Sequence, residues 1–209
     1  MKNLYQILIT TLLFTLMSCG SSKDTIIPTK EKLNLDEGYT IIWYGRSKVF
    51  RYDEGDWVRA EENDYEFTVT QKRIDNKWKS IKNMHRRHPE FNTMFGDRNQ
   101  TMYFEVDYYE MKGDTVYANV TSTLGNGNVV SDNEFRNTVI TMYPKTNAFM
   151  PYNKFRITQH YNYEKGLLTE TVELIKEKDG VETPFMKNEE TAYFFVRGKL
   201  EDAPTIFQK

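Results

Sequence analysis

The stretch TVYANVTSTL, residues Thr115–Leu124, decides the fold class of this chain. Its apolar residues fall on one face, against a face of polar residues: Val116, Ala118, Val120 and Leu124. A period of two matches the β-strand, in which successive side chains point to opposite faces of the sheet. The same alternation marks Tyr65–Ile74 and Phe155–Tyr163. We therefore predict an all-β domain whose sheet has one buried and one solvated face.

Further strands are predicted around these three. They are Thr40–Tyr44, Lys48–Tyr52, Met102–Lys112, Thr138–Tyr143, Leu167–Lys176 and Ala192–Arg197. Tight turns are predicted at Gly113-Asp114, Glu164-Lys165-Gly166 and Asp179-Gly180. About nine short antiparallel strands joined by hairpins predict a meander, which either closes into a barrel or folds as a sandwich.

One segment, Lys79–Gln100, departs from the alternation. It is long for a connection within a compact domain, which marks it as a functional loop or an insert. Ser80 is a residue type that caps a helix, and Pro89 is one that ends it. We therefore expect one long loop whose first half is helical.

The N-terminus has the layout of an export signal. Lys2 precedes a mostly apolar run, Leu4–Met17. This run is shorter than the roughly 18–20 residues that a membrane-spanning helix needs. It ends in Leu16-Met17-Ser18-Cys19, which resembles the lipobox of bacterial lipoproteins, although Met17 is an unusual residue at its position. The resemblance implies that residues 1–18 are a signal peptide and that Cys19 carries a lipid.

The remaining chain divides into a tether and a domain. Residues 19–38 are predicted to form the lipidated Cys19 and a flexible tether, and residues 39–209 a single domain. Cys19 is the only cysteine, so no disulfide is expected. The resemblance implies a cell-envelope protein anchored to a membrane through its lipid. Gly20, in place of the aspartate associated with inner-membrane retention, favours the outer membrane, with either a periplasmic or a surface-exposed domain.

Gly55-Asp56-Trp57 resembles the Gly-x-Trp signature of lipocalins, and the strand that ends at Arg197 resembles their closing strand. Small bacterial lipocalin-like lipoproteins are similar in these segments and in 167–173. The resemblance implies an up-and-down barrel in which Trp57 closes one end and Arg197 packs over it. The alternative is a tight turn that leads to an ordinary core tryptophan.

A basic segment is the main candidate for ligand contact. Lys72–Arg98 holds eight Lys and Arg against three acids. The candidates are Arg73, His85, Arg86, Arg87, His88 and Arg98. Guanidinium groups suit carboxylates and phosphates, so we predict recognition of an acidic group. The alternatives are a solvated basic face and, less well supported because the arginines would repel a cation, a metal site at the histidines.

No catalytic motif supports an enzyme, and no cofactor is predicted. The formal net charge of −2 implies no general affinity for nucleic acid. We expect a lipid-anchored protein that binds a small apolar or amphiphilic ligand inside its barrel. The alternative is a non-catalytic interaction protein that docks a protein or a glycan through residues 79–100.

Overall fold

A computed structural model describes residues 38–75, 77–91, 97–145 and 151–199. These residues form eleven β-strands and one short 3₁₀ helix, and no α-helix lies among them. The strands are β1 (Tyr39–Asp53), β2 (Asp56–Arg59), β3 (Tyr65–Ile74), β4 (Lys77–His85), β5 (Asn99–Lys112), β6 (Thr115–Ser122), β7 (Gly125–Asp132), β8 (Asn137–Pro144), β9 (Lys154–Asn162), β10 (Leu167–Lys178) and β11 (Val181–Lys199). The 3₁₀ helix is Glu61–Asn63.

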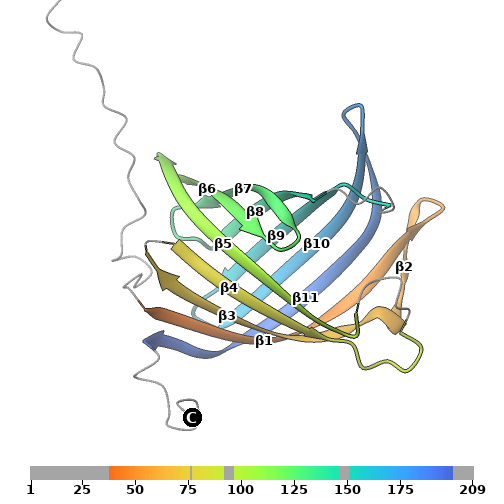
Figure 1. The fold of residues 1–209 in the computed structure, drawn as a ribbon, viewed down its shortest axis with the longest axis horizontal. Coiled ribbons are helices and arrows are strands. Elements are labelled where there is room, and N and C mark those ends of the chain that lie inside the picture. Colours follow the sequence, from red (N-terminus) through yellow and green to blue (C-terminus); the bar gives the residue numbers. More distant parts are fainter. Residues whose placement is uncertain (1–37, 76, 92–96, 146–150, 200–209) are drawn as a thin grey trace, which may run out of the picture.

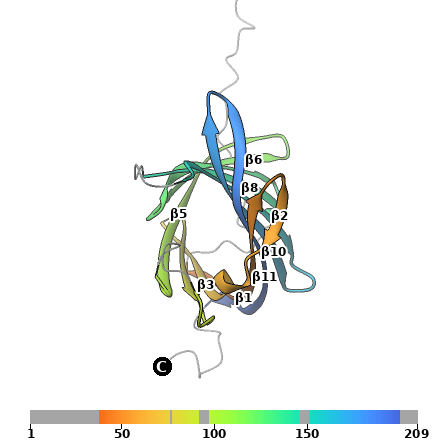
Figure 2. The same cartoon turned by 90° about the vertical axis from the view of Figure 1, so that its right-hand side faces the viewer.

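Ten of the strands close into one antiparallel barrel, as the meander interpretation predicts (Figure 1). From β3 to β11 each strand pairs with the next along the chain, and β1 pairs with both β3 and β11. The view in Figure 2 shows the strands arranged around a central lumen. Closure leaves no free edge along the barrel wall. The short strand β2 pairs only with the last four residues of β1, 50–53.

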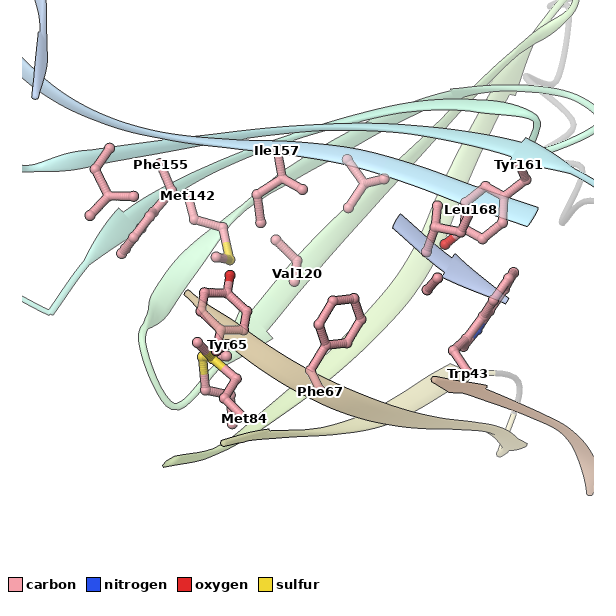
Figure 3. Packing of buried hydrophobic residues seen from close by; sticks show 14 of the residues in the cluster. Trp43, Tyr65, Phe67, Met84, Val120, Met142, Phe155, Ile157, Tyr161 and Leu168 are labelled. Atoms are coloured by element: carbon pink, nitrogen blue, oxygen red, sulfur yellow. The ribbon is translucent and has the colours of Figure 1, made fainter. Parts of the chain in front are cut away.

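The core follows from the alternation that predicted the strands. Apolar side chains from opposite walls point toward one another across the lumen, as Figure 3 shows for Val120 and Phe67. Polar residues such as Thr121 and Thr68 take the alternate positions and are exposed. The side-chain period of two therefore places one set inside the barrel and the other in solvent.

The two ends of the barrel differ. At what we call the terminal end, Tyr39 pairs with Lys199, and the turns are short. At what we call the loop end, longer connections join β1 to β3, β4 to β5 and β8 to β9. The turn at Asp179-Gly180 lies at this loop end, and both residues have positive φ, 53° and 78°, as a type I′ hairpin turn requires.

The helix predicted within Lys79–Gln100 is wrong. Residues 77–85 form β4, which pairs with β3 and β5. The inward side chains of β4 include Ser80 and Lys82, which are polar but buried. Since the inward face of β4 is only partly apolar, the strand shows no alternation of hydrophobicity in the sequence.

Two other strand predictions are corrected by the pairing. Thr40–Tyr44 and Lys48–Tyr52 are parts of one continuous strand, β1, and this strand closes the barrel.

The strand β7 was not predicted, because its Gly-Asn-Gly-Asn start is typical of a turn. A Cβ on Gly127 would lie 1.9 Å from the carbonyl oxygen of Thr141, so glycine lets β7 and β8 approach closely here.

Candidate binding cavity

The barrel encloses a cavity of about 710 Å³. Every barrel strand contributes side chains to its wall, and β2 contributes none. Most of the lining is aromatic, aliphatic or methionine, with Met84, Met102, Met142 and Met186 coming from four different strands. Methionine side chains are flexible and polarizable, so this part of the wall can adapt to ligands of different shape.

Aromatic side chains gather toward the terminal end. The rings of Tyr161 and Tyr163 stack with their centroids 5.7 Å apart, and Tyr161 also contacts Trp43 at 5.4 Å. Trp43 is fully buried, and its indole nitrogen donates a hydrogen bond to the Gln71 side chain at 2.9 Å. The polar atom of this ring is therefore satisfied within the barrel wall.

A buried ion cluster crosses the barrel interior. The ammonium of Lys82 on β4 lies 2.6 Å from each carboxylate oxygen of Glu190 on β11. It also lies 3.4 Å from Glu170 Oε1 on β10. The strands β3 and β1 lie between β4 and β11 in the wall, so these contacts reach across the lumen.

Further hydrogen bonds hold the two carboxylates in place. The Tyr65 hydroxyl donates to Glu190 at 2.5 Å and accepts from the Asn188 amide at 3.0 Å. The Gln159 amide donates to Glu170. The two buried carboxylates stabilise the positive charge of the ammonium that they share, but they also repel each other.

The electrostatics of Glu190 follow from this arrangement. Burial disfavours its ionised form, and the neighbouring Glu170 adds repulsion, which together outweigh the attraction of Lys82. The pKa of Glu190 is raised to about 7. Burial opposes the charge of Lys82, but the two carboxylates more than compensate and raise its pKa. Burial, with Glu190 beside it, raises the pKa of the Tyr65 hydroxyl well above its ordinary value.

Arg86 is the predicted basic residue that lines the cavity. It directly follows β4 at the loop end, it is 6% exposed, and its guanidinium donates to the Asp97 carbonyl at 2.7 Å. The guanidinium carbon lies 5.5 Å from the centroid of the Tyr65 ring and 5.0 Å from that of Phe91. Burial lowers the pKa of Arg86, which nevertheless keeps its charge near neutral pH.

The other predicted basic residues are not gathered at the cavity. Arg87 is exposed and pairs with Glu66 at 2.8 Å on the outer wall. His85 is exposed and contacts the Asn99 side chain. Arg98 is exposed and donates to the main-chain carbonyls of Arg86 and His88 at 3.0 and 2.9 Å.

Arg73 is buried but lies far from Arg86. The register pairs Arg73 with Trp78, eight residues before Arg86 on the β4 side of the barrel. At the rise of an extended strand this spacing corresponds to about 26 Å. Arg73 therefore belongs to the terminal end and Arg86 to the loop end.

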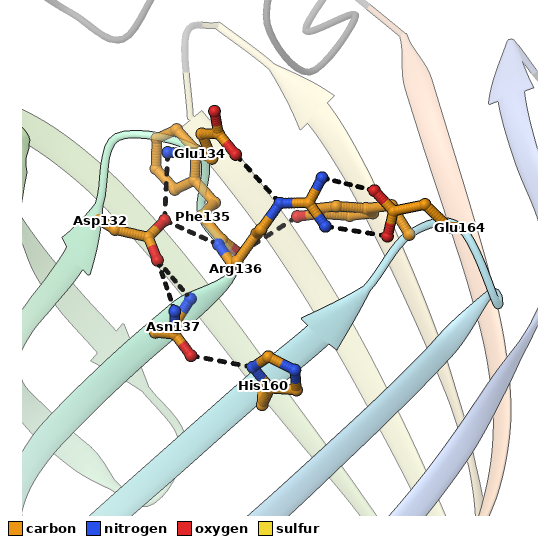
Figure 4. Close-up of polar contacts among 8 residues, drawn as sticks. Asp132, Glu134, Phe135, Arg136, Asn137, His160 and Glu164 are labelled. Carbon is orange, nitrogen blue, oxygen red and sulfur yellow. Dashed lines mark hydrogen bonds and ion pairs between the residues drawn. The ribbon is translucent and has the colours of Figure 1, made fainter.

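The histidines do not converge. His160 lies on the outer face of β9, where its ring nitrogen contacts the Asn137 side chain at 2.8 Å (Figure 4). Asn137 in turn contacts Asp132, whose carboxylate organises the turn between β7 and β8. Among the described residues, no group of three His, Cys, Asp or Glu side chains is placed to hold a metal ion.

The register separates Trp57 from Arg197. Trp57 pairs with Tyr52, whereas Arg197 pairs with Ile41, and these two partners are eleven positions apart on β1. That spacing corresponds to about 36 Å along the strand. The cation beside Trp57 is Lys187, whose ammonium lies 5.0 Å from the ring.

The interpretation of the sequence missed the central cluster of Lys82, Glu170 and Glu190. A signal was present, because Glu170 shares its strand face with the apolar residues Leu168 and Val172. A charged residue on an otherwise apolar strand face predicts a buried charge with a partner. The partner itself could not be read, since Lys82 lies 88 residues away from Glu170 and 108 from Glu190.

Cys19 and the predicted signal peptide and tether up to residue 37 lie outside the described residues. In the described part of the chain, no helix is long and apolar enough to cross a membrane. A comparison of the chain with protein-family models gives no match, and a comparison with curated proteins gives none either.

Proposed function

We propose that this protein binds one small apolar or amphiphilic molecule inside its barrel and is held at the cell envelope by a lipid on Cys19. The observation that carries the binding function is the cavity of about 710 Å³ with its largely apolar lining. Small-molecule sites in proteins are concave, mostly apolar and roughly 300–1,000 Å³ in volume. A barrel whose interior was filled by side chains would have no room for a ligand.

The lining also favours a ligand with a long apolar part. Aromatic rings such as Tyr161 and Tyr163 gather at the terminal end, whereas Met84, Met142, Phe155 and Arg86 lie toward the loop end. An elongated amphiphile would bury its apolar part against the rings and keep its polar group near Arg86. Each buried methylene would contribute about 0.8 kcal/mol.

The anchoring part of the proposal rests on the lipobox resemblance. Residues 20–38 precede the first barrel strand, and a flexible segment of this length spans about 25 Å. The tether joins the barrel at its terminal end, where β1 begins. The loop end, with Arg86, would then face away from the membrane, and the outer membrane is the location that Gly20 favours.

The lipocalin-like part of the proposal is limited by the strand count. The up-and-down topology and the open lumen support it, but ten strands form this barrel and lipocalin barrels have eight. The Trp57–Arg197 contact that a lipocalin would have is not supported by the register. The proposal therefore keeps the ligand-holding barrel and does not depend on that contact.

The interaction-protein alternative has one supporting observation. Ile81 and Tyr103 are paired neighbours on the outer wall and are 39% and 53% exposed. They lie in β4 and β5, within and next to the segment proposed for docking. Two side chains cover much less than the roughly 800 Å² that each partner buries in a stable interface. The cavity is therefore the better supported site.

The test uses the full chain with Cys19→Ser, which has no thiol for a lipid. The probe is N-phenyl-1-naphthylamine, an uncharged dye that fluoresces when it enters an apolar site. We expect saturable binding of the dye, and we expect Val120→Trp to weaken it at least tenfold because the indole would occupy the lumen. Ile140→Trp, on another part of the cavity wall, serves the same purpose if Val120→Trp does not fold.

The matched control is Val130→Trp, which adds the same ring to the outer face of β7, where Val130 is exposed. We expect this variant to bind the dye as the parent does. Absence of saturable binding by the parent, or equal loss in the inner and outer variants, would contradict binding in the barrel. Native mass spectrometry of the protein as purified from cells would then identify any molecule already bound.

A further inference from the structure

The cavity contains two cations near one aromatic ring. Lys82 and Arg86 both project inward, four positions apart on and just after β4. The ammonium of Lys82 lies 6.0 Å from the centroid of the Tyr65 ring, and the guanidinium carbon of Arg86 lies 5.5 Å from it. Both cations therefore lie against the same aromatic ring in the lumen.

The charges of the cavity wall balance only when both acids are ionised. Its charged lining residues are Lys82, Arg86, Glu170 and Glu190. Glu190 neutralises Lys82 by contacting it through both oxygens. Arg86 forms no salt bridge with any residue that the structure describes; its guanidinium donates to the Asp97 carbonyl, and the Asp97 carboxylate acts on it through charge attraction without direct contact.

A proton on Glu190 would change this balance. Neutral Glu190 would leave one net positive charge on the wall and would weaken its hold on the Lys82 ammonium. An anion entering the cavity could then contact both Lys82 and Arg86. The pKa of Glu190, raised to about 7 by burial and by Glu170, makes this protonation accessible near neutral pH.

We propose that the ligand is an amphiphile with one anionic head group, carboxylate or phosphodiester, which Arg86 and Lys82 bind together while Glu190 takes up one proton from solvent. The inference rests on the proposed function, because it requires a ligand inside the barrel. It names the head group of that ligand and a coupling between binding and pH.

The groups that face Glu190 support the assignment of the proton to this residue. They are Tyr65 from β3, Lys82 from β4, Glu170 from β10 and Asn188 from β11, and Ser47 on β1 is its register partner. Tyr65 stays neutral and Lys82 stays charged, since both of their pKa values are raised. Asn188 and Ser47 do not titrate.

The experiment measures displacement of N-phenyl-1-naphthylamine from the Cys19→Ser chain at pH values from 6 to 9. The competitors are palmitate, 1-palmitoyl lysophosphatidylglycerol and the uncharged hexadecanol. Above pH 7, uptake of one proton weakens binding of an anion tenfold for each pH unit. Because Glu190 with a pKa of about 7 is already half protonated at pH 7, we expect the dissociation constant of the better anionic competitor to rise about 50-fold between pH 7 and pH 9, while that of hexadecanol stays constant.

The two anionic competitors distinguish the source of the head group. Tighter binding of palmitate assigns a free carboxylate, and tighter binding of the lysophospholipid assigns a phospholipid head group. Either result supports the inference when it shows the expected pH dependence. Equal binding of all three competitors at every pH would overturn it while leaving the proposed function intact, whereas failure of the dye to bind would contradict the proposed function.

Three variants locate the site. Arg86→Gln should weaken binding of the anion at least tenfold and leave hexadecanol unchanged. Glu190→Gln should abolish the pH dependence and keep anion binding tight at pH 9. Arg87→Gln is the matched control, because Arg87 is adjacent in sequence but lies on the outer wall, and it should change neither.

If Glu190→Gln does not fold, Arg86→Gln and the pH series of the parent protein decide the question. A full pH dependence of anion binding in Arg86→Gln, with no loss of affinity, would exclude Arg86 from the site. Weakened anion binding in Arg87→Gln equal to that in Arg86→Gln would assign the effect to the general charge of the chain instead.

Discussion

Gly45 occupies a point on β1 where no side chain fits. A Cβ there would lie 2.4 Å from the Phe67 ring, 2.7 Å from the Ala192 Cβ and 2.7 Å from the Thr191 carbonyl oxygen. The first atom belongs to a buried ring and the last to the backbone of β11, so neither moves freely. Glycine therefore permits β1 to close the barrel between β3 and β11 at this level.

We expect Gly45→Ala to lower the free energy of unfolding by about 1–3 kcal/mol, as overpacking of a tight core does. Urea unfolding followed by tryptophan fluorescence measures the change. The control is Thr68→Ala on the exposed face of β3, for which a change within about 0.5 kcal/mol is expected. Equal stability of Gly45→Ala and the parent would show that β11 can shift to accept the methyl group.

Individual side chains also show where prediction from sequence stopped. Arg86 was among the candidates for anion recognition and does line the cavity. Arg87, the next residue, was predicted for the same role and lies on the opposite side of the wall. A run of basic residues identifies a charged segment, but the alternation of β4 continues into the residues directly after it, so Arg86 is buried and Arg87 is exposed.

At the scale of elements, the turn between β7 and β8 depends on one carboxylate. Asp132 accepts hydrogen bonds from the backbone N–H groups of Glu134, Arg136 and Asn137 at 3.1, 2.8 and 2.8 Å (Figure 4). Partial burial opposes its charge, but these hydrogen bonds outweigh burial and lower the pKa of Asp132. The ionised form therefore stabilises the turn.

We expect Asp132→Ala to destabilise the protein by about 1–2 kcal/mol, since three N–H groups lose a charged acceptor. Because the pKa is lowered on folding, this stabilisation is present above about pH 4 and is lost as the pH falls further. Urea unfolding at pH 7 and pH 3 measures both effects. Asp114→Ala is the control, because its carboxylate accepts one bond from the Asn133 side chain, and a loss as large as that of Asp132→Ala would argue against the backbone contacts.

Element prediction succeeded where the two faces of a strand differ in polarity. Thr115–Leu124 and Phe155–Tyr163 correspond to β6 and β9, with Val120 and Ile157 directed inward as expected. It failed for β4, because Lys82 is a buried charge, and for β7, because glycines take the place of apolar residues. In both strands the inward residue is explained by a contact with another strand: Lys82 contacts Glu170 and Glu190, and Gly127 lies against the backbone of Thr141.

At the scale of the whole molecule, the barrel is hollow, and a ligand in the cavity would stabilise it. A ligand that binds the folded state alone, at 100 times its dissociation constant, adds about 2.7 kcal/mol to the free energy of unfolding. For a domain of this size we expect a rise in melting temperature of roughly 5–10 °C. Thermal unfolding, with and without added palmitate, measures this rise in protein from which any copurified ligand has been extracted. The variant Val120→Trp, whose indole would fill the lumen, should show no rise.

A rise of the same size in Val120→Trp would place the stabilising site outside the lumen. No rise in the parent protein, at a palmitate concentration that displaces the dye, would mean that the unfolded chain binds palmitate equally well. The first outcome would contradict binding in the cavity, whereas the second would leave the binding site in place and contradict only the expected stabilisation.

The sequence by itself determined the all-β class, most of the strands, the hairpin turns and the N-terminal segment from which we propose a lipid anchor. These properties depend on local spacing, that is, on side chains two positions apart and on turn residues between strands. Only the tertiary structure decided that β1 and β11 close the wall, that β4 is a strand and that Lys82 meets Glu170 and Glu190 inside a cavity. The closing pairs of β1 with β11 and the contacts of Lys82 join residues about 90 to 160 positions apart, and a local pattern carries no information on which distant strands become neighbours around a barrel.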